Sequence, residues 1–518
     1  MNQAVTTKGH PKGLYVLFAT EMWERFNYYG MRAILVYFMT QALLFKTDFS
    51  NSLYGSYISL LYFSALVGGY VADRYWGNKR SILVGGVVMV IGELILFICA
   101  SIYDSSPDLA NILFFSGLGF MIAGNGFFKA NISSLVGQLY PKGDIRVDPA
   151  YTIFYMGINI GAMVGPIICG YFGDTGDPSD FKWAFLIAGI GMLISIIIQK
   201  IYHDKYVRTP DGKILGLTPG TDVDVNDTTV PASSYIKAPP KIWLNPAFII
   251  VGMLAFGALT IGIIYLDSKY NYLFYLIAAS FVFIIYIILS DKSLTSDERQ
   301  RIWVLIIIAF FVVFFWGAYE QTGSTLALFA RDQTNRNLLG YEIPASFFQS
   351  VNSIFIILFA SIFAWMWLRM GKKQPATPTK MGIGLILLAL GFLWIAYGVK
   401  SAQTQKVSMI WLIGLYLLHT WGELCLSPIG LSLFNKLSPL KFASLLMAVW
   451  FLGNAGGNKL VGVLGALYPE NGKTTSFLGY QMNNLYDFFM LFVFMGGIAG
   501  VILLALSKRL QKMMHGIT

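Results

Sequence analysis

Long runs of apolar residues, separated by short polar segments, dominate the chain from end to end. Most runs approach the roughly 20 residues that an α-helix needs to cross the hydrocarbon core of a bilayer. The pattern therefore predicts about fourteen membrane-spanning helices. They lie near residues 14–43, 52–72, 81–102, 108–137, 150–174, 183–202, 244–266, 271–290, 301–328, 346–368, 381–398, 407–434, 442–467 and 484–507.

One long polar interval, about residues 203–243, interrupts this series and is rich in Pro, Asp, Thr and Lys. Six predicted helices precede it, two follow as a pair, and six more complete the chain. Such a division is typical of transporters built from two similar halves. We expect an N-terminal six-helix bundle (1–203), a cytoplasmic linker (204–243), an inserted transmembrane hairpin (244–295) and a C-terminal six-helix bundle (296–518).

Composition supports a polytopic membrane protein and excludes several other classes. Of the 518 residues 56% are hydrophobic and 12% charged, whereas a soluble domain carries about 25% charged residues. With the N-terminus inside, about 25 Lys and Arg residues fall in inner loops and about 8 in outer loops. This positive-inside pattern predicts that both termini are cytoplasmic, and it explains the net charge of +10 without a nucleic-acid partner.

The three cysteines, Cys99, Cys169 and Cys425, all lie in apolar spans. Their spacing indicates neither a metal site nor a disulfide framework. No cleavable signal peptide is expected, because the first helix can itself direct insertion.

The first predicted helix carries ionisable residues inside an apolar run. At helical spacing they form one continuous face together with two tyrosines. A charge at the centre of a membrane helix costs about 2.5–3.5 kcal/mol, so this face is expected to meet partners or water. Its members are Glu21, Glu24, Arg25, Tyr28, Tyr29 and Arg32.

Residues 21–30 read E-M-W-E-R-F-N-Y-Y-G. They match every fixed position of E-x-x-E-R-F-x-Y-Y-G, the signature of the proton-dependent oligopeptide transporter family within the major facilitator superfamily. The segment 69–80 is similar to the superfamily's loop signature. Further segments resemble family motifs in the family's order, with Ala130 and Ser353 where proline is usual. These segments are 124–131, 154–161, 315–321, 349–353 and 422–431.

The resemblance covers essentially the whole chain and implies an all-α fold of the major facilitator type, with two six-helix bundles and an inserted two-helix hairpin. The short connection at about 400–406 resembles bacterial members, which implies a multi-pass protein of the cell inner membrane. It further implies proton-coupled import of di- and tripeptides, and of peptidomimetic drugs, by alternating access. The proton gradient would replace any cofactor, no catalysis is expected, and a monomer in the lipid bilayer would suffice.

A short peptide carries an ammonium, a carboxylate and amide groups, so its site needs a positive pole, a negative pole and amide partners. Arg25 and Lys129 can bind the carboxylate and Glu423 the ammonium, with Asn352 beside Glu423. The resemblance gives the same positions these roles. It adds further pocket residues: Tyr28, Tyr29, Tyr62, Tyr155, Asn159, Phe315, Trp316 and Ser427.

Proton coupling needs a carboxylate whose protonation changes during transport. By the resemblance Glu320, with Arg32 as its switchable partner, is the expected carrier, and Glu21 and Glu24 are secondary sites. Gate roles are expected for four residues. An internal latch between helices would include Asp73 and Arg74, and a bend in one helix would be allowed by Pro428 and Gly430.

Structural alternatives stay open at each position. Arg25 could serve only to neutralise Glu21 or Glu24, and Glu423 could hydrogen-bond Ser427 or His419. Any single aromatic residue is as compatible with core packing as with a pocket. The nearest functional rival is a related proton-coupled carrier for nitrate, an amino acid or a peptide-like drug. An enzyme is disfavoured because the spans contain neither H-E-x-x-H nor G-x-S-x-G, and a channel because charges of both signs suit an occludable pocket.

Overall fold

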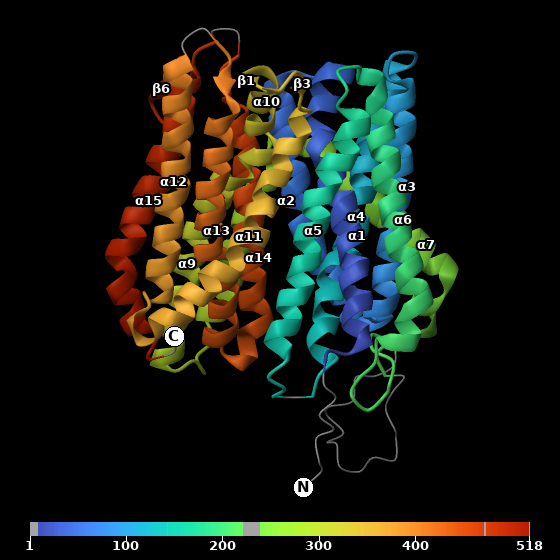
Figure 1. The fold of residues 1–518 in the computed structure, drawn as a ribbon. Helices are drawn as coiled ribbons and strands as arrows, with labels where there is room; N and C mark the ends of the chain where they lie inside the picture. The colour runs from blue at the N-terminus through green and yellow to red at the C-terminus, as the bar shows by residue number, and fades with distance from the viewer. Residues whose placement is uncertain (1–8, 142, 221–238, 403–404, 471–472, 517–518) are drawn as a thin grey trace, which may run out of the picture. The chain divides into compact units, whose positions relative to one another are not determined.

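The computed structural model is almost entirely helical and describes residues 9–141, 143–220, 239–402, 405–470 and 473–516 (Figure 1). Its α-helices are α1 (Lys12–Tyr37), α2 (Thr47–Val71), α3 (Asn78–Ile102), α4 (Pro107–Gln138), α5 (Val147–Gly173), α6 (Phe181–Tyr206), α7 (Pro246–Tyr270), α8 (Tyr272–Leu289), α9 (Ser296–Tyr319), α10 (Thr325–Asp332), α11 (Gln349–Met370), α12 (Thr377–Ala402), α13 (Met409–Leu437), α14 (Ala443–Gly465) and α15 (Leu485–Met513).

Short strands occur only in connections of the described chain. One pair is parallel, β1 with β4, and two pairs are antiparallel hairpins, β2 with β3 and β5 with β6. Their bounds are β1 (Thr334–Asn335), β2 (Asn337–Leu338), β3 (Tyr341–Glu342), β4 (Val407–Ser408), β5 (Thr475–Phe477) and β6 (Tyr480–Met482). Of the predicted linker, residues 221–238 lie outside the described part.

Each of the fourteen apolar runs forms helix, so the fold class predicted from the sequence is confirmed. Twelve helices of the described chain are long and apolar enough to span a membrane, and the shortest of them is α8 with 18 residues. The long helices α1 and α14 are not among the twelve. Buried polar residues lower the mean hydropathy of both helices: α1 carries the ionic face described above, and α14 carries Asn454, Asn458 and Lys459.

Residues 301–328 lie within one candidate membrane span, Ser296–Asp332, as predicted, but the sequence did not reveal that this span is broken. α9 ends at Tyr319, a 3-10 turn covers Glu320–Gly323, and α10 starts at Thr325. A Cβ on Gly323 would lie 1.9 Å from the Tyr54 hydroxyl and 2.9 Å from Arg32 Nε. The backbone at Gly323 therefore lies so close to Tyr54 and Arg32 that a residue with a Cβ would not fit there. The hydrophobic periodicity of one segment cannot reveal such a contact with other helices.

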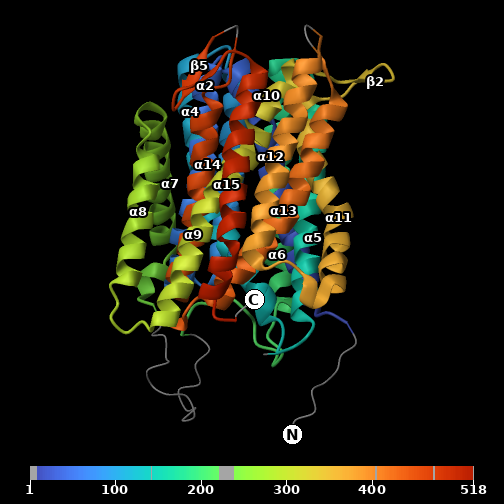
Figure 2. The ribbon, with the colours of Figure 1, turned by 90° about the vertical axis from the view of Figure 1, so that its left-hand side faces the viewer.

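The chain divides into two compact units. Unit 1 comprises Met1–Met31, Phe63–Gly173 and Ser179–Gly262; unit 2 comprises Arg32–Tyr62, Asp174–Pro178 and Ile263–Thr518. Within unit 1, α3 packs against α4 and α6; within unit 2, α12 packs against α13 and α15, and α9 against α14 (Figures 1 and 2). Helices α1, α2 and α7 each contribute to both units, and the domain boundaries expected at 203, 243 and 295 stay predictions.

Small residues bring α2 and α14 into close contact within unit 2. A Cβ on Gly55 would lie 2.4 Å from the backbone nitrogen of Gly462, and the Asn51 side chain donates to Gly465 O at 2.9 Å. Such approach of backbones is how membrane helices associate without a hydrophobic driving force.

Replacing Gly55 by Val should therefore destabilise the protein, because the atoms in the way belong to the backbone of α14 and cannot move aside. We expect a loss of about 1–3 kcal/mol, the usual range for overpacking, measured as a lower melting temperature of the purified protein in detergent. Gly262→Ala is the matched control: no atom lies within 4 Å of its Cβ position, and alanine favours helix by about 1 kcal/mol. Equal melting temperatures of the two variants would contradict the expectation.

Candidate functional site

The ionic face of α1 forms a buried cluster in unit 1. Arg25 Nε lies 2.7 Å from Glu21 Oε1 and 3.0 Å from Glu24 Oε2, and all three side chains are buried. The other Glu24 oxygen accepts a hydrogen bond from Asn125 Nδ2 on α4 at 2.9 Å. Arg25 thus has two carboxylates as partners, which is the pairing that the structural alternative anticipated.

Lys129, one helical turn after Asn125 on α4, interacts electrostatically with Glu24. The cluster therefore contains two cations and two carboxylates. Arg25 also lies over the Tyr28 ring, with its guanidinium carbon 5.9 Å from the centroid. Both cations that the sequence predicts to bind a carboxylate therefore interact with acids of α1.

The remaining pocket residues predicted in unit 1 do not all join the ionic cluster. The Tyr28 and Tyr29 rings lie edge to face, with centroids 4.9 Å apart. Asn159 is buried, and its Nδ2 donates to the Tyr155 carbonyl one turn earlier in α5 at 2.9 Å. Tyr155 itself is exposed. The structure thus joins Tyr28 to the ionic cluster, and it ties Asn159 to its own helix.

In unit 2, Glu423 on α13 is buried among hydrogen-bond donors. The Tyr319 hydroxyl on α9 donates to Glu423 Oε2, and Asn352 Nδ2 on α11 lies 3.4 Å from the same oxygen. Asn352 also donates to Thr420 Oγ1 at 2.9 Å. No ion pair of the described residues includes Glu423. Its partners are therefore Tyr319 and Asn352, rather than the Ser427 or His419 considered from the sequence.

Two aromatic residues of α9 pack against Tyr319, the hydroxyl donor to this carboxylate. Phe315 is fully buried and stacks on Tyr319 with centroids 5.5 Å apart, and the Trp316 ring lies edge-on to Tyr319 at 5.3 Å. Tyr62 and Ser427 are half-buried. Tyr319 is thus fixed by its neighbours so that its hydroxyl points to Glu423.

Arg32 and Glu320 form an ion pair in unit 2, with both side chains buried. Arg32 comes from α1 and Glu320 from the turn after α9, so the pair joins segments 288 residues apart. The broken helix explains the position of Glu320, because the carboxylate leaves α9 where the helix ends. Arg32 has the partner that the family resemblance implied.

The predicted gate residues lie in different surroundings. Asp73 and Arg74 are exposed, in a π-helical turn that follows α2. Pro428 lies inside α13, and a Cβ on Gly430 would lie 2.5 Å from the Trp450 ring of α14. The structure therefore gives Gly430 a packing role, and the latch and hinge roles stay predictions.

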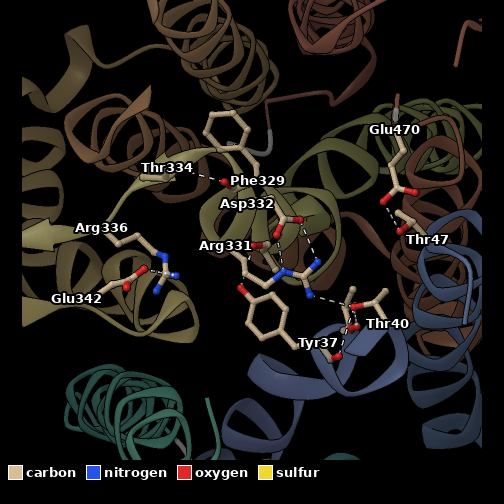
Figure 3. Close-up of polar contacts among 12 residues, drawn as sticks. Tyr37, Thr40, Thr47, Phe329, Arg331, Asp332, Thr334, Arg336, Glu342 and Glu470 are labelled. Atoms are coloured by element: carbon tan, nitrogen blue, oxygen red, sulfur yellow. Dashed lines mark hydrogen bonds and ion pairs between the residues drawn. The ribbon is translucent and has the colours of Figure 1, made fainter. Parts of the chain in front are cut away.

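A polar network holds the end of α1 and the start of α2 in unit 2 (Figure 3). Arg331 on α10 donates to Thr40 Oγ1 at 3.0 Å and pairs with Asp332 at 2.7 Å. Tyr37 donates to the Ala327 carbonyl at 2.8 Å, and Thr47 donates to Glu470. These contacts lie at the end of α1 remote from the N-terminus.

Two residues of the site, Asn125 and Tyr319, received no role from the sequence. Both belong to segments that resemble family motifs, 124–131 and 315–321. The sequence did contain a signal for each of them. Asn125 lies one helical turn before Lys129, and Tyr319 lies one helical turn after Phe315. Their partners Glu24 and Glu423 are about a hundred residues away in the chain, so the pairing itself required the structure.

Buried carboxylates and cations on the helices of a membrane-spanning protein mark a path for a polar substrate or an ion. The fold and the site therefore define the class as a polytopic membrane transporter. A model of the POT family matches residues 79–213 and 261–479, and the chain belongs to this family.

Two bacterial peptide transporters are similar to this chain over most of its length. It is 34% identical to the peptide transporter YePEPT of Yersinia enterocolitica over 467 residues, covering 88% of each chain. It is 30% identical to a di-/tripeptide transporter of Lactococcus lactis subsp. cremoris, covering 98% of this chain and 97% of the relative. The crystal structure of a POT family transporter in complex with a thioalcohol-conjugated peptide superimposes with a TM-score of 0.80 at 30% identity, covering 97% of both chains. The fold is that of the major facilitator superfamily.

Proposed function

We propose that this protein is a proton-coupled symporter that imports di- and tripeptides by alternating access. The named activity of two bacterial relatives, and the conjugated peptide bound to a similar structure, support a peptide substrate. The arrangement of charged loops supports an inner-membrane protein with cytoplasmic termini. The proposal requires no cofactor, no catalysis and no second subunit, and it extends to peptide-like drugs.

The observation that carries the proposal is the environment of Glu423. A buried carboxylate that accepts from a hydroxyl and an amide, but from no cation, retains unsatisfied negative charge. The ammonium of a peptide would supply the missing cation at this carboxylate, with charge-assisted hydrogen bonds. Asn352, already beside Glu423, would hold the amino-terminal end in register.

Arg25 and Lys129 are proposed to bind the peptide carboxylate. Arg25 is paired with Glu21 and Glu24 in the absence of substrate. Protonation of either glutamate would weaken that pairing and leave the guanidinium available to the peptide. Proton binding would thereby prepare the cationic pole for its ligand.

The coupling proton is proposed to act at Glu320. The ionised carboxylate holds Arg32, which lies five residues before the end of α1. Protonation removes the negative charge and releases Arg32, so the segment 32–62 can separate from the rest of unit 2. Protonation and access to the outer side would thus be linked through one ion pair.

The proposal is tested by counterflow of labelled di-alanine in proteoliposomes, with competitors that lack either one pole or the peptide bond between the poles. Unlabelled di-alanine should compete, whereas N-acetyl-di-alanine and di-alanine amide should compete at least about tenfold less, since each lost charge-assisted contact is worth about 1.5–3 kcal/mol. Free alanine should also compete at least about tenfold less, because its two charges are too close together to reach both poles of the site. Nitrate should have no effect. Competition by nitrate or by free alanine at the level of di-alanine would identify the rival carrier instead.

A further inference from the structure

Lys459 is a cation buried in α14 for which the transport site provides no role. Its side chain is 0% exposed, and its ammonium contacts Asp267 Oδ2 at 2.5 Å, Ser56 Oγ at 2.8 Å and Asn271 Oδ1 at 3.1 Å. An ammonium has three N–H donors. Each of them is satisfied, two by the inserted hairpin and one by α2.

Asp267 lies in the last turn of α7, and Asn271 is the single residue between α7 and α8. Figure 2 shows the tight connection between these two helices. Asp267 is 1% exposed; its Oδ1 accepts from the backbone nitrogen of Leu273 at 2.8 Å, which leaves Oδ2 for Lys459. Asn271 lies at φ 54, a left-handed conformation that asparagine tolerates. The turn therefore fixes both oxygens that face the ammonium.

α14 needs such a partner in order to remain in the membrane. It is not among the helices apolar enough to span unaided, and it carries the buried Asn454 and Asn458 besides Lys459. One uncompensated lysine at the helix centre already costs about 2.5–3.5 kcal/mol. Asp267 supplies the opposite charge, and no other ion pair of the described chain involves either residue.

The same face of α14 contacts the first half of α2. Ser59 Oγ donates to the Ala455 carbonyl at 2.7 Å, and Asn458 Nδ2 lies 3.4 Å from the Ile58 carbonyl. Ser56 donates to its own helix, at Ser52 O, and accepts from Lys459. Lys459 is therefore the side chain that links the hairpin to α2.

We propose that the inserted hairpin is the charge partner of α14 and that, through Lys459, it holds the first half of α2 against α14. Asp267 and Lys459 are then positioning residues, which act on the movement of α2 and not on the substrate. This role goes beyond peptide transport and is measurable without any substrate.

The charge-partner role is tested with Asp267→Leu, Lys459→Met and the double variant. Each single change leaves one buried charge without a partner, whereas the double change leaves none. We expect clearly lower melting temperatures and yields for both single variants, and recovery of most of the loss in the double variant. A wild-type melting temperature of Asp267→Leu, or a double variant no better than the singles, would overturn this role.

The link to α2 is tested with Ser56→Ala, which leaves the Lys459–Asp267 pair intact. The reporter is a Ser59→Cys substitution, and its rate of reaction with a charged, water-soluble thiol reagent is measured. The native Cys99, Cys169 and Cys425 are buried, and their background is measured in the protein without the reporter.

Removing one hydrogen bond worth about 1 kcal/mol should raise the labelling rate about fivefold, while the melting temperature changes little. Ser50→Ala is the matched control: Ser50 is also buried on α2, and its hydroxyl has no hydrogen-bond partner in the described structure. Equal labelling rates in the Ser56→Ala and Ser50→Ala backgrounds would overturn the link. Because no peptide is present, this result is independent of the proposed substrate.

Discussion

A Glu320→Gln variant is expected to exchange dipeptide across proteoliposome membranes but not to accumulate it. Glutamine preserves the shape of the side chain and can still accept from Arg32, but it cannot alternate between a charged and a neutral form. One proton driven by 100 mV and one pH unit corresponds to about 2.3 plus 1.4 kcal/mol, enough for the wild type to concentrate a zwitterionic peptide several hundredfold. In proteoliposomes with the variant, the ratio of inside to outside dipeptide concentration should stay near one.

The matched control for this experiment is Glu342→Gln. Glu342 also pairs with an arginine in unit 2, Arg336 at 2.8 Å, but its side chain is 65% exposed. An exposed pair contributes about 0–1 kcal/mol, so this variant should accumulate peptide like the wild type. Accumulation against a gradient by Glu320→Gln would assign the coupling proton to another carboxylate.

A Glu423→Gln variant is expected to lose most of its affinity for unmodified dipeptides. The Tyr319 hydroxyl and the Asn352 amide can still bond the glutamine oxygen, so the fold should be retained while the negative charge is removed. Truncating one partner of a buried charge pair costs about 2–5 kcal/mol, which corresponds to a roughly 30- to 4,000-fold higher half-saturating concentration in counterflow.

The informative comparison is with N-acetyl-di-alanine, which has no ammonium. Wild type and Glu423→Gln should bind this ligand equally weakly, because neither complex contains the ion pair. Should Glu423→Gln weaken the acetylated and the free peptide by the same factor, Glu423 would have a structural role and the ammonium site would lie elsewhere.

The helices and the family were predictable because membrane spans are local features and the signature 21–30 is contiguous. The pairing of Arg32 with Glu320 was also accessible, through the resemblance. What escaped prediction involves distant contacts: the break after α9 places Gly323 against Tyr54, and Asn125 and Tyr319 acquire their roles from Glu24 and Glu423.

The Lys459–Asp267 pair was predictable only in part. Lys459 was visible as a charge inside the predicted span 442–467, whereas Asp267 falls in the short connection between the predicted spans 244–266 and 271–290. Their opposite signs suit a pair. Several helices separate them in the chain, however, and many other partners were equally compatible with the spacing. The contact between the hairpin and α14 becomes evident only in the folded structure.

The shortness of α8 has a consequence for the lipid around the protein. At 1.5 Å per residue its 18 residues extend about 27 Å, slightly less than the average hydrocarbon thickness of about 30 Å. Its outward side chains include Tyr275, Phe283 and Tyr286, each more than 60% exposed. The acyl chains next to this hairpin must therefore compress, and the chain length of the phospholipid used for reconstitution becomes a variable that acts on the hairpin first.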